Sequence, residues 1–376
     1  MIWKKSGRIL VIPILLLLHI TLNAQKEYGI FYEPEMSDSA TWQYGIKNTN
    51  FFKNNEYFNN ITEGYTLVGY FVEPYVTYHP VKYVSIHAGI HALKYSGRDK
   101  FSKVLPVFRI AVMPGPNFKI IMGKLYGTIN HELSEPILQP ENYFINNNEN
   151  GIQFLVNRKK YRMDLWLNWE QFILWGSPFQ EKFTAGTHHT YTLISGNNYG
   201  TFKFSFQGLV THKGGQIDSA AGDVQSIANY APGLIYMSKK ENRFVQIQSH
   251  IVSFADISPV KKLPFIYGFG TYTKVHFSYR DFSFIGTHWY GNLYITTRGE
   301  PLFQSISIFK PGYYEKKRAL LGSEFYYQKN LYGAVGLRTG FVIWYDLYNK
   351  IPDYNYALYL VYNLNVLPEK TITHEN

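Results

Sequence analysis

Histidines are the residues of this sequence whose positions most directly suggest chemistry. The pairs His131–Glu132 and His188–His189 and the single His288 are candidate bases. In acyl transfer, such a base activates a nucleophile beside it and is held in place by a third group. The sequence contains no G-x-S-x-G motif, and no serine or aspartate stands in a compelling position beside these histidines. We therefore predict no catalytic residues and expect that the chain is not an enzyme.

A metal site would need histidines that converge on one point. His87 and His91 are four residues apart and share one face if the segment is a strand. At that spacing they lie ~13 Å apart, which is too far for one ion without further ligands. His188 and His189 would point to opposite faces of a strand. We expect hydrogen-bonded histidines, no metal and no cofactor.

The segment "YRMDLWLNWE", residues 161–170, indicates which kind of secondary structure the chain forms. Polar and apolar side chains alternate along it, which fits a strand, although Leu165, Trp169 and Phe172 also have helical spacing. Predicted strands at 151–157 and 183–194 flank the segment, and a helix there would leave both without a partner. We predict a strand with Met163, Leu165, Leu167 and Trp169 toward lipid.

Alternating segments of about ten residues recur from Tyr65 onward, which is the length of a tilted membrane strand. In "TFKFSFQ", for example, Phe202, Phe204 and Phe206 oppose Lys203, Ser205 and Gln207. The alternation is less clear in 117–130 and 281–296, which we also predict to be strands because β-branched and aromatic residues dominate them.

The first 24 residues have the three-part layout of a secretory signal peptide. A basic start precedes an apolar run from Ile9 to Ile20, and we predict a cut after Ala24. The run is too short to cross a bilayer, which argues against the alternative of a membrane anchor. We assign 1–24 to a signal peptide, 25–64 to an N-terminal segment with a possible first strand, 65–367 to a barrel and 368–376 to a C-terminal tail.

The composition favours a membrane barrel over a soluble protein. Aromatic residues make up 18% of the chain and charged residues 17%, below the ~25% of ordinary soluble domains. Tyrosine and tryptophan concentrate where an apolar phase meets water. The formal charge of +10 includes Lys4, Lys5 and Arg8, and no dense basic run indicates nucleic acid. The chain has no cysteine, so neither a disulfide nor a lipoprotein anchor is expected.

The spacing of the connections gives the strand count. Seven short turns alternate with longer polar stretches, as in outer-membrane barrels with tight periplasmic turns and long outside loops. The turns are at 79–82, 114–117, 157–160, 195–198, 238–242, 279–281 and 328–330. We predict an all-β, transmembrane, antiparallel up-and-down β-barrel of about 16 strands, with 14 to 18 as the range. A propeller or a sandwich is the rival, but the chain shows neither a 40–50-residue repeat nor a linker-like break in composition.

The inward positions of these strands carry the candidate site of a channel, because rings of charged side chains sort solutes. A ring of this size is wide enough for water, although long loops or residues 25–60 could fold inside and plug it. The stretch 128–151, which is acidic and rich in asparagine, is expected to be a solvated outside loop. The predicted lumen-facing side chains are His87, His91, Lys103, Arg109, Arg162, Asp164, Asn168, Glu170, Lys203, Gln207, Gln246, Gln248, His250 and Arg338.

The "NAQ" ending of the leader, the aromatic alternating strands and the rhythm of turns resemble uncharacterised porin-like outer-membrane β-barrel proteins of Bacteroidota. The tail "PEKTITHEN" departs from barrels that close on an aromatic final residue. The resemblance implies a passive channel for small polar solutes in the outer membrane of a Gram-negative bacterium. Its partners would be outer-membrane lipid and a second copy in a homo-oligomer, with no nucleic acid. The alternative is a non-conducting barrel that serves as an export or assembly partner or as a lipid-modifying enzyme, such as an outer-membrane hydrolase.

Overall fold

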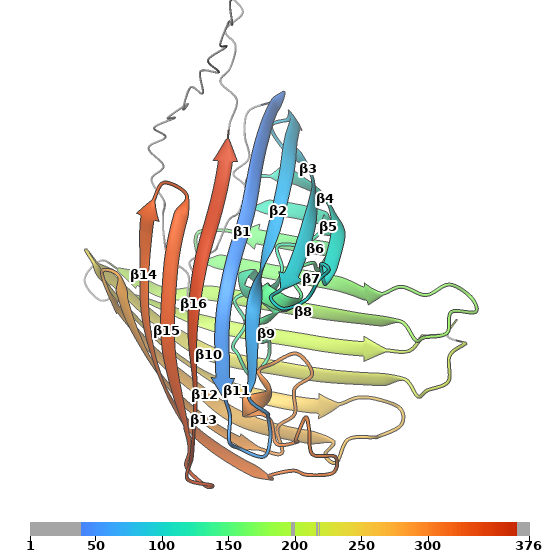
Figure 1. Cartoon of the computed structure of the whole chain (residues 1–376), viewed down its shortest axis with the longest axis vertical. Helices are drawn as coiled ribbons and strands as arrows, with labels where there is room; N and C mark the ends of the chain where they lie inside the picture. The colour runs from blue at the N-terminus through green and yellow to red at the C-terminus, as the bar shows by residue number, and fades with distance from the viewer. Residues whose placement is uncertain (1–38, 197–199, 216, 218, 367–376) are drawn as a thin grey trace, which may run out of the picture.

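The chain forms one closed β-barrel (Figure 1). The structure, a computed structural model, describes residues 39–196, 200–215, 217 and 219–366. Sixteen antiparallel strands follow one another in chain order, and the first pairs with the last. The predicted fold class and the count of sixteen are therefore confirmed. The predicted signal peptide and C-terminal tail lie outside the described residues. Within the described part of the chain, no helix is long and apolar enough to span a membrane.

The strands are 7 to 17 residues long, and three short helical turns lie in the connections. Their bounds are β1 (Thr41–Glu56), β2 (Tyr65–Val81), β3 (Val84–Tyr95), β4 (Lys103–Gly115), β5 (Phe118–Lys124), η1 (Thr128–His131), α1 (Asn142–Ile145), β6 (Asn150–Asn157), β7 (Tyr161–Gln171), β8 (Lys182–Gly196), β9 (Gly200–Lys213), β10 (Gln225–Lys240), β11 (Arg243–Asp256), β12 (Tyr267–Tyr279), β13 (Phe282–Asn292), η2 (Pro301–Phe303), β14 (Lys317–Tyr332), β15 (Val335–Asp346) and β16 (Ile351–Val366).

The two faces of the wall follow the alternation in the sequence. On β9, Phe202, Phe204 and Phe206 are exposed on the outside, whereas Ser205 and Gln207 are buried. Hydrocarbon offers no hydrogen bonds to the backbone, so a wall that is apolar on its outer face must pair all of its amides within the ring. The register from Tyr44↔Val366 to Glu56↔Tyr354 closes the ring between β1 and β16.

Short turns and long connections alternate round the ring, with the short turns toward the upper left of Figure 1. One turn differs from the prediction. The residues 328–330 belong to β14, and the chain reverses at residues 333–334, where Gly333 has φ +51°. Glycine takes this left-handed conformation without steric cost, and asparagine and lysine at 328–330 can remain in the ladder.

Two long connections fill the inside of the barrel. We call residues 125–149, between β5 and β6, and residues 293–316, between β13 and β14, the plug segments. Ile137, Leu302 and Phe303 have no exposed surface and pack with the inward-facing Trp289 of β13 in one apolar core. The prediction that 128–151 is a solvated outside loop is therefore wrong, because its apolar residues gain more from burial in the lumen than from water.

Both plug segments begin where a predicted strand ends early. The segment 117–130 is a strand only as far as Lys124, because Leu125 and Tyr126 leave the ladder and pack against Trp166 inside the barrel. The segment 281–296 is a strand only as far as Asn292. Leu293 has φ +56°, a left-handed conformation that a leucine rarely adopts and that breaks the ladder.

The two plug segments are bonded to each other. The amide of Gln139 donates to the carbonyl of Arg298 at 2.8 Å, and the amide of Glu300 donates to the carbonyl of Glu135 at 2.8 Å. The hydroxyl of Tyr294 donates to the carbonyl of Pro136, also at 2.8 Å. The segments therefore form one body inside the ring.

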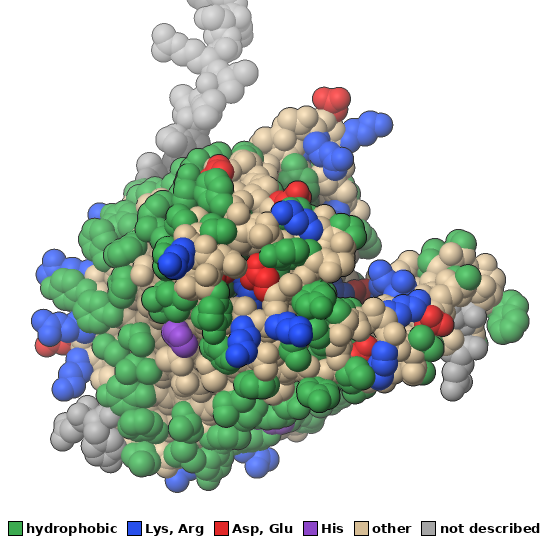
Figure 2. Space-filling model, turned by 90° about the horizontal axis from the view of Figure 1, so that it is seen from below, with side chains coloured by type: hydrophobic (Ala, Val, Ile, Leu, Met, Phe, Trp, Pro, Cys, Tyr) green, Lys and Arg blue, Asp and Glu red, His purple; other side chains and the backbone are tan. Residues whose placement is uncertain are grey.

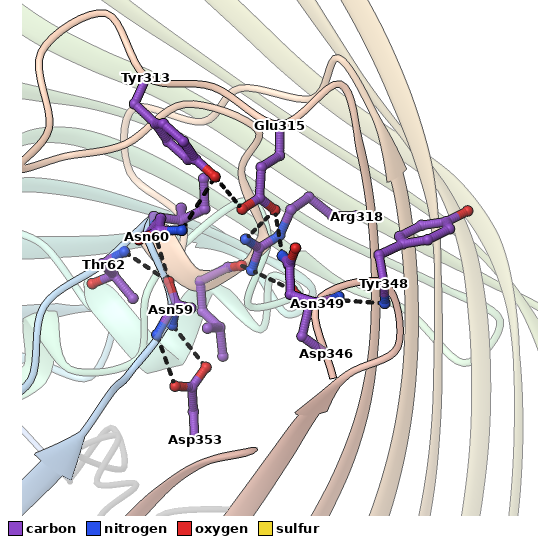
Figure 3. Close-up of polar contacts among 12 residues, drawn as sticks. Asn59, Asn60, Thr62, Tyr313, Glu315, Arg318, Asp346, Tyr348, Asn349 and Asp353 are labelled. Carbon is purple, nitrogen blue, oxygen red and sulfur yellow. Dashed lines mark hydrogen bonds and ion pairs between the residues drawn. The ribbon is translucent and has the colours of Figure 1, made fainter. Parts of the chain in front are cut away.

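A polar network fixes this body to the long-loop mouth (Figure 3). Arg318, at the start of β14, has no exposed surface; it bonds Glu315 at 2.8 Å and lies 3.7 Å from Asp346. Its guanidinium also donates to the carbonyl of Leu302 at 3.2 Å. The same mouth holds Asp353 of β16, which accepts the backbone amide of the β1–β2 connection at Phe58, at 2.6 Å.

Substitution of Arg318 tests how the second plug segment is held at the mouth of the barrel. We expect Arg318→Met to leave Glu315 and Asp346 without their cation, which typically destabilises a buried pair by about 3–5 kcal/mol. The segment 293–316 should then detach from the mouth. Limited proteolysis of the detergent-solubilised protein should cut this segment at least about tenfold faster than in the parent, because a destabilisation of that size makes the detached state more populated.

The matched control is Lys316→Met, which removes an exposed cation two residues away. It should leave the cleavage rate unchanged. Equal cleavage of Arg318→Met and the parent would contradict the role of the buried arginine.

Candidate functional site

A cavity of about 200 Å³ lies between the first plug segment and the wall of β4 to β8. We call it the His131 cavity. The first plug segment contributes His131 to its lining, and β7 and β8 contribute Asp164 and His188. Pro116 and Asn117 of the β4–β5 turn also line it, so the cavity lies near the short-turn end of the barrel.

His131 ends η1 and is held from three sides. Its Nδ1 lies 2.7 Å from Oδ2 of Asp164, and its Nε2 lies 2.9 Å from Oε2 of Glu149. Its ring stacks on Trp166 with centroids 3.5 Å apart and planes at 8°. Burial alone would lower the pKa of His131, but the two carboxylates outweigh burial and raise that pKa to about 9. His131 is therefore a charged clamp at neutral pH and has no nitrogen left to act as a base.

Residues of the plug and the wall bond the two carboxylates of this clamp. Gln153 of β6 donates to Asp164 at 2.8 Å and accepts the amide of Tyr126 at 2.9 Å. Glu149 accepts the amide of Thr128 at 2.9 Å through its other oxygen. The clamp thus fastens both ends of the first plug segment to the wall.

A serine and a histidine form a nucleophile–base pair next to the clamp. Nε2 of His188 lies 3.2 Å from Oγ of Ser205, and Nδ1 of His188 lies 3.0 Å from the carbonyl oxygen of His131. A carbonyl only accepts hydrogen bonds, so Nδ1 carries the proton and the neutral ring offers Nε2 to the hydroxyl of Ser205. This is the arrangement of nucleophile, base and orienting group that acyl transfer requires.

Gln207 of β9, which pairs with His188 in the β8–β9 register, bonds the plug. Its Oε1 accepts the amide of Ser134 at 2.8 Å and the hydroxyl of Ser134 at 2.6 Å, while its Nε2 lies 3.2 Å from Nε2 of His250. Ser205 itself has no exposed surface. A substrate therefore reaches its hydroxyl only when neighbouring groups move.

A second, smaller cavity of about 70 Å³ lies between both plug segments and the wall of β1 and β14 to β16. Lys53 lies 2.6 Å from Glu141, whose other oxygen accepts the hydroxyl of Tyr65 at 2.5 Å. Burial raises the pKa of Glu300, which lines the cavity; Lys53 opposes that shift and nearby carboxylates add to it, giving about 7. This cavity holds an acid–base group but no serine or threonine among its lining residues.

The structure places the fourteen predicted lumen residues in several separate networks. Seven have at most 7% of their surface exposed: His87, His91, Arg109, Asn168, Gln207, His250 and Arg338. Six are partly exposed: Lys103, Asp164, Glu170, Lys203, Gln246 and Gln248. Arg162 is exposed and lies 3.6 Å from Glu132 at the edge of the His131 cavity. Of the fourteen, Arg162 and Asp164 line the His131 cavity. Gln207 contacts Ser134 of the plug and His250 of β11, but neither Gln207 nor His250 lines the cavity.

The others bind their own neighbours. His91 lies 3.0 Å from Glu73, and His87 lies 2.8 Å from Thr77, so the two do not share a ligand. The remaining contacts join Arg109 to the carbonyl of Lys124, Lys103 to the carbonyl of Ile145, Asn168 to the amide of Asn150, Glu170 to Thr184 and Arg298, Gln246 to Gln248, and Arg338 to the ring of Tyr326.

The candidate bases also separate. His188 points inward, whereas His189 on the opposite face bonds Tyr161 and Thr187 at 2.8 Å each. His288 is exposed. Among the described residues, no group of three or more His, Asp or Glu side chains is arranged to hold a metal.

The partner of His188 was not predicted from the sequence. Ser205 and Gln207 share the inward face of "TFKFSFQ", so the alternation alone could have placed Ser205 inside. Its contact with His188 depends on the β8–β9 register, in which His188 pairs with Gln207 and Thr190 with Ser205. Glu149 and Trp166 were missed as well, because their role depends on the folding of the plug segment into the lumen.

Several solved outer-membrane proteins share the fold at very low sequence identity. An anion-selective porin from Comamonas acidovorans matches with a TM-score of 0.51 and 8% identity over 87% of this chain and 100% of its own. The trimer form of OmpT from Vibrio cholerae matches with a TM-score of 0.52 and 7% identity over 87% of this chain and 100% of its own. OprB from Pseudomonas putida matches with a TM-score of 0.53 and 8% identity over 86% of this chain and 94% of its own. These likenesses confirm the resemblance to porin-like barrels at the level of the fold, which is of the outer-membrane type.

A search of curated proteins finds no match to the sequence. The sequence model of one family, described as Lipid A 3'-O-deacylase-type, matches residues 34–371. This is a family of enzymes, so the expectation that the chain is not an enzyme is wrong. Because the match spans nearly the whole chain, the protein belongs to the Lipid A 3'-O-deacylase-type family.

Proposed function

We propose that this protein is an outer-membrane hydrolase that removes an ester-linked acyl chain from lipid A, with Ser205 as nucleophile and His188 as base. The family supports the reaction class. The observation that carries the assignment of residues is the 3.2 Å contact between Ser205 Oγ and His188 Nε2, with His188 Nδ1 fixed on the carbonyl of His131.

The proposed reaction has two halves. His188 takes the proton of the Ser205 hydroxyl while the oxygen attacks the ester carbonyl carbon, and the sugar alkoxide leaves with that proton. His188 then takes a proton from water, whose oxygen attacks the acyl carbon. The bond from that carbon to Ser205 Oγ breaks, Oγ takes the proton from His188, and the fatty acid is released. In this scheme the clamp at His131 is a positioning group, because its carbonyl holds the productive tautomer of His188.

Access to the serine requires a movement of the first plug segment. Ser205 is fully buried, whereas His188 lines the adjacent cavity of about 200 Å³. The bonds from Ser134 to Gln207 hold the plug segment over β9 at this point. We infer that an entering acyl chain displaces this contact and occupies the cavity.

The passive channel is the weaker proposal. The porin-like fold is compatible with a channel, but the apolar side chains of the plug segments, such as Ile137, Leu302 and Phe303, fill the lumen. An open pore would need both segments to leave. We therefore favour a catalytic barrel over a conducting one. We propose that the protein is exported and lies in the outer membrane. A homo-oligomer stays a prediction.

Substitution of the pair tests the proposed function. We expect His188→Gln to lower the rate of fatty-acid release from purified lipid A by about 10²–10⁴-fold, which is the usual contribution of a general base. Ser205→Ala should lower it by at least as much, because Ser205 carries the hydroxyl that contacts Nε2 of His188. The rate is measured by mass spectrometry on detergent-solubilised protein, with phosphatidylglycerol as a second substrate.

The matched control is Ser85→Ala, which removes a buried hydroxyl on β3 away from the pair. It should retain the parent rate. Full activity of Ser205→Ala would refute the assignment, and release from phosphatidylglycerol alone would refute lipid A as substrate. A parent protein that conducts ions in planar bilayers and releases no fatty acid would favour the channel.

The clamp predicts a pH dependence of stability. The pKa of His131 is raised from 6.5 to about 9 in the folded protein. Its contribution to stability is therefore complete below pH 6.5 and is lost as the pH rises through 9. The full shift corresponds to roughly 3 kcal/mol. The temperature of heat unfolding on gels should fall between pH 7 and pH 10.

In His131→Gln this fall should be smaller than in the parent. The control is His288→Gln, which alters an exposed histidine of β13 and should keep the parent profile. A profile of His131→Gln that parallels the parent would show that the clamp does not hold the plug.

A further inference from the structure

The two ends of the barrel differ in exposed charge. Within the described residues, the short-turn end exposes ten basic side chains and two acidic ones, Glu241 and Asp281. One of the ten, Arg162, lies 3.6 Å from Glu132. Lys82, Arg280 and Lys329 stand at three separate hairpins. The other six, which we call the basic collar, stand at two further hairpins: Arg158, Lys159, Lys160, Lys239, Lys240 and Arg243.

The long-loop end carries mixed charge. There, Lys262 lies 2.8 Å from Asp223, and Lys261 lies 3.9 Å from Asp256. Figure 2, seen from below, shows basic and acidic side chains near one another on this side. By contrast, no ion pair within the described part of the chain joins a collar cation to a carboxylate. The short-turn end thus carries a net positive charge.

The depth of these cations is set by the aromatic side chains next to them. Arg243 and Arg280 lie 5.9 Å and 5.2 Å from the ring of Tyr279 at the end of β12. Phe282, two residues beyond Arg280, is exposed. Tyrosines of membrane proteins sit at the level of the lipid headgroups, so the neighbouring cations reach the same level.

We infer that the exposed cations of the short-turn end, of which the basic collar is the densest part, bind the headgroups of net-anionic glycerophospholipids in the leaflet that surrounds the short turns. Lysine and arginine near a membrane surface attract anionic lipids. The cations occur at five hairpins round the ring, from β2–β3 to β14–β15. A leaflet contacts the whole circumference, whereas a soluble acidic protein would contact one side. The distribution therefore fits lipid better than a protein partner.

Spin-labelled lipids test this inference on the full-length protein in phosphatidylcholine vesicles. The measured quantity is the motionally restricted fraction of labelled phosphatidylglycerol relative to labelled phosphatidylcholine. The parent should favour phosphatidylglycerol by at least about threefold. Replacement of Lys159, Lys160, Lys239 and Lys240 by glutamine should bring the ratio close to one. Salt at about 1 M should do the same, because it shortens the electrostatic screening length to about 3 Å.

The matched control replaces Lys261, Lys262, Lys316 and Lys317 by glutamine, which makes the same charge change at the long-loop end. It should keep the parent ratio. Equal loss in both variants, or a parent without preference, would overturn the inference. The salt series on the parent decides the matter even if the collar variant fails to form a heat-modifiable barrel.

Discussion

The structure depends on one constraint: every backbone amide that lies in hydrocarbon must find its partner within the chain. The pairing of β1 with β16 meets it by closing the ring, so that no strand is left with a free edge. The alternation of side chains follows from the closure, since each strand then has a lipid face and an inner face. Ring closure also fixes the diameter, because sixteen strands enclose a space too wide for wall side chains alone to fill.

That space explains the plug segments. They carry apolar side chains such as Ile137 and Phe303 into the lumen and cover the inward Trp289 of β13. Each segment begins where its strand is interrupted, and buried ion pairs then fix both of them. Arg318 holds the second segment at the long-loop mouth, and His131 holds the first against β7. The same clamp that fills the lumen orients His188 through a backbone carbonyl, so packing and the proposed chemistry share one contact.

The sequence predicted what is local. The alternation of Phe202, Phe204 and Phe206 gives the two faces of a strand, and the turns give the count. It left a plug of long loops or of residues 25–60 open as an alternative but did not assign the plug to residues 128–151, because they have the polar composition of a loop and their apolar side chains follow no period. Nor did it predict the contact of Ser205 with His188, which depends on the exact β8–β9 register. Information that arises from long-range pairing and from the filling of a closed space is absent from any single segment.

In the proposed function, the inside of the barrel is a reaction site rather than a pore. Covalent labelling measures this most directly, because a fluorophosphonate reacts with a serine only when a base activates its hydroxyl. The parent protein, incubated with such a probe in lipid A-containing micelles and digested, should carry the adduct on Ser205, and His188→Gln should carry none. An adduct on a different serine, or fatty-acid release that persists with Ser205 unlabelled at saturating probe, would contradict it.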